Sequence, residues 1–300
     1  MRAYHMIWFI FALGGALSQA AYATAVKILL RRTDPFLLAG CSFLAASGLL
    51  CIISLFFGIP SLGPELFPSI GVTVCINILA TILLYHALGT SDISLCMPML
   101  AFTPVFLIGT SFLILGEIPT IAGACGILFV ASGAYFLTSG GSIARCDRLA
   151  APFHRLTVDR GVLSMLLVAF LFSISVNYDK KVVENSDPVF GSAFVFLLLG
   201  SAFLLIALLS KRRGADLMYA SLRAPLPLFI GVGVILAAEI VMINIAYTMS
   251  IVSYVITVKR LAIFFSVVAG ITIFREGLSW GRITGALVMV TGAGMIALFG

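Results

Sequence analysis

The feature that most constrains this chain is a succession of ten apolar runs, each about as long as a membrane is thick. A helix needs roughly 20 apolar residues to cross the hydrocarbon core of a bilayer. The runs cover approximately residues 5–26, 36–57, 68–88, 94–115, 120–138, 161–179, 189–210, 227–248, 252–274 and 280–299. In lipid, a helix satisfies all of its own backbone polar groups. The sequence therefore predicts an all-α integral membrane protein with ten transmembrane helices.

The composition supports a membrane protein and argues against other classes. Hydrophobic residues make up 61% of the chain and charged residues only 10%, whereas soluble domains are about half apolar and a quarter charged. A net charge of +6 favours nucleic acid in a soluble protein, but here the basic residues cluster between the apolar runs, so we expect no nucleic-acid partner. The six cysteines have no metal or redox spacing. We therefore expect neither a metal nor a cofactor.

The chain contains an internal repeat. Asp34-Pro35 recurs as Asp187-Pro188 after an offset of 153 residues. Further residues recur at an offset of 159: Glu117 and Glu276, Gly126 and Gly285, Gly133 and Gly292. We predict a first five-helix repeat over residues 1–138, a polar linker over 139–160, and a second five-helix repeat over 161–300. Because each repeat has an odd number of spans, the two lie in opposite orientations, an arrangement typical of secondary transporters.

The distribution of Lys and Arg predicts the orientation in the membrane. One side of the predicted spans carries 13 of these residues and the other side carries 3. The richer side holds Lys27, Arg31, Arg32, Arg145, Arg148, Arg155, Arg160, Lys211, Arg212, Arg213, Arg223, Arg275 and Arg282. Since cytoplasmic loops carry the excess of basic residues, this bias places both termini outside the cytoplasm.

Several motifs resemble those of a known transporter family. Pro104 precedes Glu117 by thirteen residues, Leu115-Gly116-Glu117 ends the fourth predicted helix, and the fifth and tenth helices are rich in glycine. With the paired repeat, these features resemble the ten-helix EamA-type members of the drug/metabolite transporter superfamily over nearly the whole chain. The resemblance implies a multi-pass protein of the bacterial cytoplasmic (inner) membrane. Members of that family are usually drawn with their termini inside the cytoplasm, opposite to the Lys and Arg bias.

The chain departs from the family pattern in places that bear on its substrate. Phe43 and Phe196 occupy positions of the second helix of each repeat where the family often has an Arg, and Ile263 replaces the second-half proline. In the ninth helix, Lys259-Arg260 and their neighbours resemble the Lys-Arg pair of triose-phosphate and nucleotide-sugar translocators over about 20 residues. In that branch the pair grips the phosphate of the substrate.

Charged residues in the middle of predicted spans are the strongest functional candidates. Lys259, Arg260 and Glu239 lie well inside the ninth and eighth helices, where a charge costs several kcal/mol unless it is paired or functional. Their first-half equivalents carry no charge: Leu100, Ala101 and Ala80. The fold therefore does not require these charges. Adjacent helical residues point about 100° apart, so we expect one base to hold an anionic ligand while the other pairs with Glu239. The alternative is purely structural: one base pairs with Glu239 and the other extends to the interface.

Other polar residues are weaker candidates for the same cavity. On the eighth and ninth helices these are Asn244, Tyr247 and Tyr254, and on the third helix they are Asn77, Tyr85 and His86. His86 titrates near neutral pH and suits a proton relay, but a lone His at a helix end is more often simply hydrogen-bonded. We expect the polar residues 177–181, at the end of the sixth run, to anchor in the headgroups, and Glu117 and Glu276 to be capping or loop charges.

The pattern as a whole favours a secondary transporter that moves a small anionic or zwitterionic metabolite by alternating access, with the substrate held at the midplane by Lys259 and Arg260. A flippase for a lipid-linked phosphate and an exporter of amino acids or drugs are the alternatives. We expect no enzymatic activity, because no nucleophile–base pair lies inside the spans. The glycines of the tenth helix predict an internal helix contact or a homodimer face, so the protein is expected to be a monomer or a homodimer in contact with membrane lipid.

Overall fold

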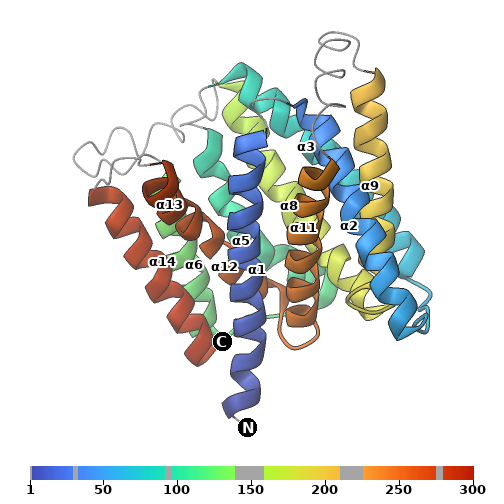
Figure 1. The fold of residues 1–300 in the computed structure, drawn as a ribbon. Coiled ribbons are helices and arrows are strands. Elements are labelled where there is room, and N and C mark those ends of the chain that lie inside the picture. The colour runs from blue at the N-terminus through green and yellow to red at the C-terminus, as the bar shows by residue number, and fades with distance from the viewer. Residues whose placement is uncertain (1, 30–32, 92–95, 139–158, 210–225, 275–279) are drawn as a thin grey trace.

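A computed structural model of the chain describes residues 2–29, 33–91, 96–138, 159–209, 226–274 and 280–300, and within these ranges the chain is helical, with no strand. The helices are α1 (Arg2–Leu29), α2 (Pro35–Phe57), α3 (Leu66–Thr90), η1 (Met97–Phe102), α5 (Thr103–Leu115), α6 (Ile121–Thr138), α8 (Arg160–Glu184), α9 (Phe190–Leu209), α11 (Leu226–Tyr247), α12 (Val252–Lys259), α13 (Leu261–Phe274) and α14 (Trp280–Phe299). Figure 1 shows them as one bundle. Most of the predicted linker lies outside the described ranges, and the boundaries of the halves stay a prediction.

The helices have the length and composition of membrane spans. In the described ranges nine segments are long and apolar enough to cross a bilayer, and Ile283–Phe299 of α14 is a shorter apolar helix. Large apolar side chains cover the outside, such as Phe56 and Leu113, which are 86% and 80% exposed. Contiguous apolar surface of this kind is rare on soluble proteins. Together with the positions of the ten spans, it confirms the predicted all-α membrane class.

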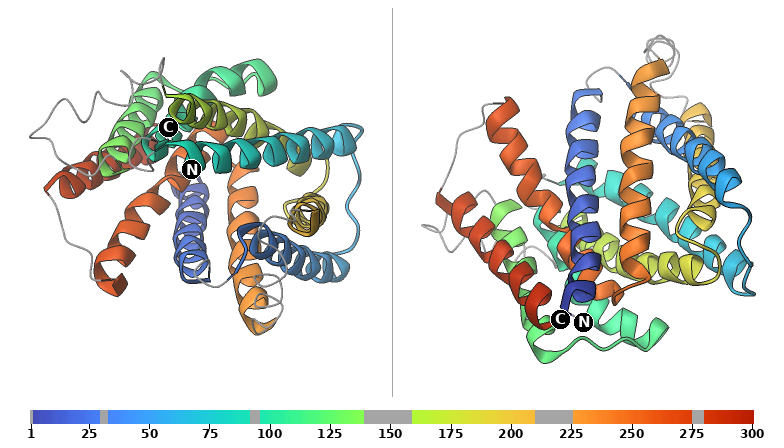
Figure 2. Two further views of the ribbon diagram at one scale, coloured as in Figure 1. Left: turned by 90° about the horizontal axis from the view of Figure 1, so that it is seen from above. Right: turned by 60° about the horizontal axis from the view of Figure 1, so that its bottom comes forward.

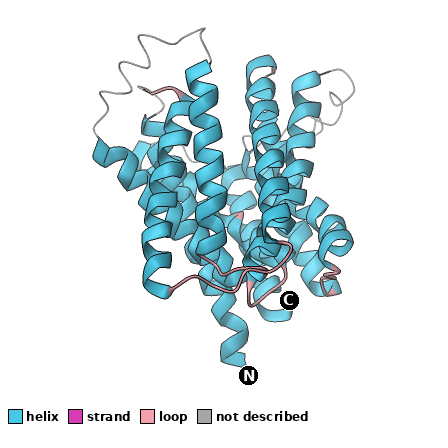
Figure 3. Cartoon of the chain, turned by 90° about the vertical axis from the view of Figure 1, so that its right-hand side faces the viewer, coloured by secondary structure: helices cyan, strands magenta, loops and turns pink. Residues whose placement is uncertain are grey.

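The two halves pack on each other in a symmetric way. α2 contacts α9 and α6 contacts α14, so the second and fifth spans of one half meet their equivalents in the other. The contact of α1 with α11 has its counterpart in that of α8 with α3. Both termini lie at one end of the bundle (Figures 2 and 3). We call this the terminal end. The C-terminal ends of α5 and α8 also lie here, and the C-terminal ends of α1 and α9 lie at the opposite end. This pairing is the one that two inverted five-helix repeats require.

The repeated Asp-Pro motif begins the second helix of each half. Oδ1 of Asp34 accepts hydrogen bonds from the backbone N–H groups of Phe36 and Leu37 at 2.9 and 3.1 Å. Oδ1 of Asp187 accepts in the same way from Val189 and Phe190, at 2.7 and 2.6 Å. An aspartate at this position satisfies N–H groups that have no partner inside the helix, which explains why the motif recurs.

Glycines bring the fifth spans of the two halves into backbone contact. A Cβ atom on Gly133 would lie 2.6 Å from the backbone oxygen of Gly285, and one on Gly126 would lie 2.8 Å from that of Gly292. Only glycine permits this approach. The stripe on α14 is therefore an internal contact, one of the two possibilities that the sequence left open. Gly294 meets nothing within 4 Å and takes no part in it.

The fourth span of each half is interrupted near its middle. In the first half, the 3-10 helix η1 gives way to α5 at Phe102 and Thr103, between Pro98 and Pro104. The two prolines account for this break, because proline removes a backbone donor. In the second half, α12 ends at Lys259 and α13 begins at Leu261. That break contains no proline, and we did not expect it. At the offset of 159, Phe102 corresponds to Leu261, so the two breaks fall within about one residue of each other.

Candidate functional site

A cavity of about 500 Å³ lies in the centre of the bundle. Its lining comes from α1, α2, α3, α5, α8, α9, α11, α12 and the α12–α13 junction, and so from both halves. Four charged side chains line it: Asp179, Glu239, Lys259 and Arg260. Two are acids and two are bases, so the described lining has no net charge when all four are ionised. The cavity is therefore not the net positive one that the sequence suggested.

Two of the four charges neutralise each other. Nζ of Lys259 lies 2.8 Å from Oε1 of Glu239, and the two side chains are 21% and 8% exposed. The pair joins the end of α12 to the middle of α11. At this depth each charge alone would be costly, and a direct ion pair offsets that cost in part. The pairing of one base with Glu239, which both sequence interpretations required, is present.

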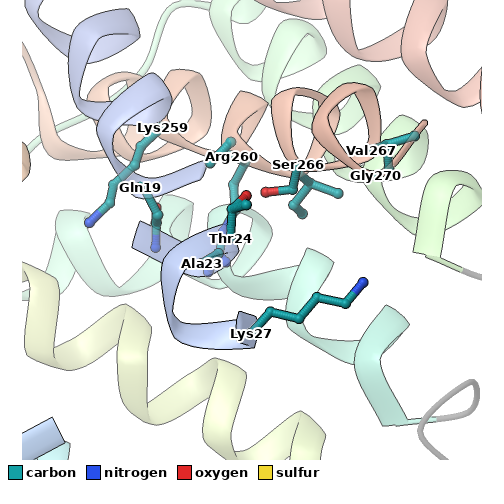
Figure 4. A pocket seen from close by; sticks show the side chains of 11 residues that line it. Gln19, Ala23, Thr24, Lys27, Lys259, Arg260, Ser266, Val267 and Gly270 are labelled. Atoms are coloured by element: carbon teal, nitrogen blue, oxygen red, sulfur yellow. The ribbon is translucent and has the colours of Figure 1, made fainter. Parts of the chain in front are cut away.

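Arg260 has no such partner. Its Nε atom is buried without a hydrogen bond, and its guanidinium makes no ion pair with the described residues. Arg260 stands at the junction of α12 and α13, where it lines the central cavity and a second one of about 350 Å³ between α1 and α13. Figure 4 shows how the residues of α1 and of α12–α13 face each other around this second cavity. Arg260 is therefore the basic group that remains available for a ligand.

Asp179 is an acid of the cavity that the sequence analysis missed. Its Oδ1 accepts a hydrogen bond of 2.5 Å from Oγ1 of Thr73, and nearby Nδ2 of Asn77 donates to Oγ of Ser175 at 2.6 Å. The prediction that residues 177–181 anchor in the headgroups is wrong for Asn177, Asp179 and Lys180. The physical reason is length: α8 continues to Glu184, so these residues lie inside the bundle rather than at its edge.

Six of the nine predicted site residues line the central cavity, and three do not. Those that line it are Lys259, Arg260, Glu239, Asn244, Tyr85 and Asn77. Tyr247 is buried outside the lining, and His86 is exposed. Tyr254 lies toward the terminal end, where its ring stacks on that of Trp8 and its hydroxyl accepts a hydrogen bond from the N–H of Thr120.

Asn244 lines the cavity but also has a structural task. Its Nδ2 donates to the backbone oxygen of Pro188 at 2.8 Å and to Oγ of Ser192 at 2.6 Å. Both partners belong to the beginning of α9. Its Oδ1 is buried without a partner. Asn244 therefore ties α11 to α9 at the base of the cavity while one acceptor remains unsatisfied.

Aromatic rings form one wall of the cavity. The rings of Phe43 and Phe196 meet edge to face with centroids 5.1 Å apart, and Phe43 also meets Phe203 at 5.8 Å. All three residues line the cavity. This wall of the cavity is therefore an apolar, aromatic surface. Such a surface suits an apolar part of a ligand.

A second buried ion pair stabilises the terminal end of the bundle. Nζ of Lys180 on α8 lies 2.5 Å from Oε1 of Glu117 and donates to the backbone oxygen of Ser250 at 3.1 Å. Oε2 of Glu117 accepts from the N–H of Val252, the first residue of α12, at 2.8 Å. Glu117 is thus a capping charge, as predicted, but it caps a helix of the other half. Its repeat equivalent, Glu276, lies outside the described residues.

Comparisons with known proteins agree with this architecture. A family model described as the EamA-like transporter family matches residues 6–139 and again residues 159–298. One solved structure, described as the crystal structure of a protein, superimposes with a TM-score of 0.74 over 99% of this chain and 98% of that chain, at 14% sequence identity. At that identity the similarity concerns the fold alone. No curated protein matches the chain.

Proposed function

Because the chain belongs to the EamA-like transporter family, it is a multi-pass membrane transporter of the drug and metabolite type, and we propose that its cargo is a small zwitterion held in the central cavity. The observation that carries this proposal is the charge left after internal pairing. Glu239 and Lys259 neutralise each other, which leaves Arg260 and Asp179 facing the same cavity. A basic and an acidic group in one cavity complement a ligand that carries one charge of each sign.

Each of the two residues suits its half of such a ligand. The planar guanidinium of Arg260 donates two parallel hydrogen bonds to a carboxylate or phosphate. The carboxylate of Asp179 accepts from Thr73 through one oxygen and retains acceptor capacity for an ammonium group. A ligand with two or more negative charges would be repelled by Asp179 and Glu239. This argument favours a zwitterion over the purely anionic metabolite that the sequence also allowed.

The size and surface of the cavity limit the cargo further. A volume of about 500 Å³ lies within the range of small-molecule sites, roughly 300–1,000 Å³. The wall of Phe43, Phe196 and Phe203 favours a cargo with an apolar or aromatic portion beside its charged groups. Amino acids and their amphipathic derivatives fit this description better than sugars do, which supports the exporter of amino acids or drugs among the alternatives.

We further propose that transport proceeds by alternating access. Inverted repeats give a site between them two related surroundings of similar energy, and the equivalent breaks at Phe102 and Arg260 offer hinge points. The Lys180–Glu117 pair and its contacts with Ser250 and Val252 would separate when the cavity opens at the terminal end. The bias of Lys and Arg in the sequence supports an orientation with this end outside the cytoplasm, in the bacterial inner membrane.

A binding screen by thermal shift tests the cargo. Purified protein is heated with amino acids, organic phosphates and sugars, and the best hit is titrated against Arg260→Ala, Asp179→Asn and, as a matched control, Lys181→Ala. Lys181 pairs with Glu65 on the exposed surface. We expect a zwitterion to stabilise the parent and the control but neither site variant. A best hit that is a sugar, or that binds both site variants as it binds the parent, contradicts the proposal.

A further inference from the structure

The gap between α1 and α13 is a second cavity with its own chemistry. It has a volume of about 350 Å³ and shares Gln19, Lys259 and Arg260 with the central cavity. The rest of its described lining comes from two facing stripes, one on α1 and one on α13: Ala23, Thr24 and Lys27, and Ala262, Ile263, Ser266, Val267 and Gly270. Because these two spans alone supply the described lining, the cavity opens on the flank of the bundle.

The flank on which it opens faces lipid. Ile28, which follows Lys27 on α1, is 52% exposed, and Val268, which follows Val267 on α13, is 41% exposed. Apolar side chains therefore border the cavity on both helices. A polar cavity within such a surface is costly unless its groups bind water or a ligand.

The two cavities differ in how many basic and acidic side chains line them. The described lining of the flank cavity holds three basic side chains, Lys27, Lys259 and Arg260, and no acidic one. Lys259 is paired with Glu239 of the central cavity, so the difference between the two cavities comes from Lys27 and Arg260. The central cavity holds two of each sign. Ser266 adds a hydroxyl donor from α13 (Figure 4). The hydroxyl of Thr24 already donates to the backbone oxygen of Ala20 at 2.8 Å. The buried Nε of Arg260, which has no hydrogen-bond partner, lies at the inner end of the same cavity.

We propose that this flank cavity binds the anionic phosphate head of a membrane lipid. The phosphate would accept hydrogen bonds from Lys27 and Ser266, and the beginning of an acyl chain would lie against the apolar side chains Ile263 and Val267. Lys27 is three residues from the end of the α1 span, the level at which basic side chains meet lipid headgroups. This site is separate from the zwitterion site, although Arg260 borders both.

The binding of lipid here would also bear on transport. α1 belongs to the first half and α13 to the second, so any motion of one half against the other changes the width of the gap. A lipid head that contacts both spans would stabilise the conformation in which the gap has this width. Anionic lipid would then act as a regulator of the transporter rather than as its cargo.

Thermal shift in detergent with added lipid tests the proposal. The probes are phosphatidylglycerol, phosphatidylcholine and inorganic phosphate, each applied to the parent and to two variants of the flank cavity. Ala23→Leu fills the cavity without a change of charge, and its matched control is Ala21→Leu, an exposed neighbour outside the lining. Lys27→Gln removes one charge, and its control is Lys181→Gln at the exposed pair with Glu65.

We expect phosphatidylglycerol to raise the melting temperature of the parent and of both controls more than phosphatidylcholine does. Ala23→Leu should abolish the difference, and Lys27→Gln should raise the half-saturating lipid concentration about fivefold, the effect of one basic residue near an anionic headgroup. Equal shifts with the two lipids, or an Ala23→Leu variant that responds like Ala21→Leu, would overturn the proposal. So would equal protection by inorganic phosphate, since the ligand would then be soluble.

One further variant separates this test from that of the cargo. Asp179→Asn alters the central cavity alone, because Asp179 does not line the flank cavity. We expect it to lose zwitterion binding and to keep the response to phosphatidylglycerol. If it loses the lipid response while its melting temperature without lipid equals that of the parent, the two cavities are one site and the assignment of a separate lipid site is wrong.

Discussion

The two interrupted helices of this transporter are equivalent in position and opposite in chemistry. The η1–α5 junction carries Leu100 and Ala101 in an apolar stretch between prolines, whereas the α12–α13 junction carries Lys259 and Arg260 without a proline. The break is therefore a property of the repeated fold, and the charge is an addition made by one half. The comparison separates what the scaffold needs from what the cargo needs, and the predictions below test that separation.

The largest effect is expected from the charge that has no partner. Arg260→Ala should weaken binding of the zwitterion found by the screen about 100-fold or more, because truncating one side of a buried charged contact costs at least about 3 kcal/mol. The matched control is Ala101→Ser, at the equivalent position of the first half, which should bind as the parent does. Titration of the purified proteins measures both. Comparable losses in the two variants would mean that the break itself, and not the charge, holds the ligand.

The paired charges should affect stability more than binding. Glu239→Gln leaves Lys259 without its partner and should lower the free energy of unfolding by about 3 kcal/mol. Adding Lys259→Met should restore most of the loss, since the double variant leaves no buried charge without a partner. Denaturant unfolding in detergent measures the single and the double variant. A double variant no more stable than Glu239→Gln would exclude the pair as the cause.

The glycine contact should behave alike in both halves. Gly133→Ala and Gly292→Ala, at equivalent positions of the two halves, each place a Cβ within 3.0 Å of backbone atoms of the facing helix, and each should cost about 2 kcal/mol of stability through overpacking. Gly48→Ala, where a Cβ meets nothing within 4 Å, is the control and should unfold as the parent does. Melting temperatures that differ strongly between the two substitutions would show that the halves are less symmetric than their backbones.

The smallest effect is expected at the terminal end. Glu117→Gln retains a cap for Val252 but loses the charge opposite Lys180. Because Lys180 keeps its hydrogen bond to the backbone oxygen of Ser250 and lies 3.8 Å from Glu184, the variant should destabilise the closed end by only about 1 kcal/mol. Its control, Lys181→Gln, removes an exposed charge paired with Glu65 and should change little. Hydrogen exchange at the start of α12 should accelerate about fivefold in the first variant only. Unchanged hydrogen exchange in Glu117→Gln would show that the Lys180–Glu117 pair does not stabilise this end.

The sequence predicted the spans well because apolar length is a local property. It also predicted that glycines of the tenth helix, such as Gly285, approach another helix closely, with an internal contact as one of two possibilities. It did not identify Gly133 as the partner. It failed at Asp179, because polar residues near the end of the sixth run made that span appear to end at residue 179 rather than at Glu184. The repeat gave no warning: Lys180 is equivalent to Lys27, which also falls just outside its predicted run, 5–26, although α1 continues to Leu29.

Membership of the cavity was only partly predictable. Periodicity places Tyr247 on a face of α11 near that of Glu239, but the rotation of a helix within a bundle is set by its neighbours. That packing turns Tyr247 out of the lining and exposes His86. The break at Arg260 has no local signature, so only comparison with the first half, where prolines mark the equivalent place, could have located it.

The glycine contact carries a consequence for the origin of the fold. Gly126 faces Gly292 and Gly133 faces Gly285, and at the offset of 159 each facing pair is the other pair with its halves exchanged. Such a patch is self-complementary in the manner of a twofold dimer interface. A single five-helix ancestor that entered the membrane in both orientations would dimerise through this patch. Fusion of two copies would then fix one copy in each orientation. In a fused chain, one copy can carry Lys259 and Arg260 while the other keeps apolar residues. A homodimer cannot differ in this way, because its two copies have the same sequence.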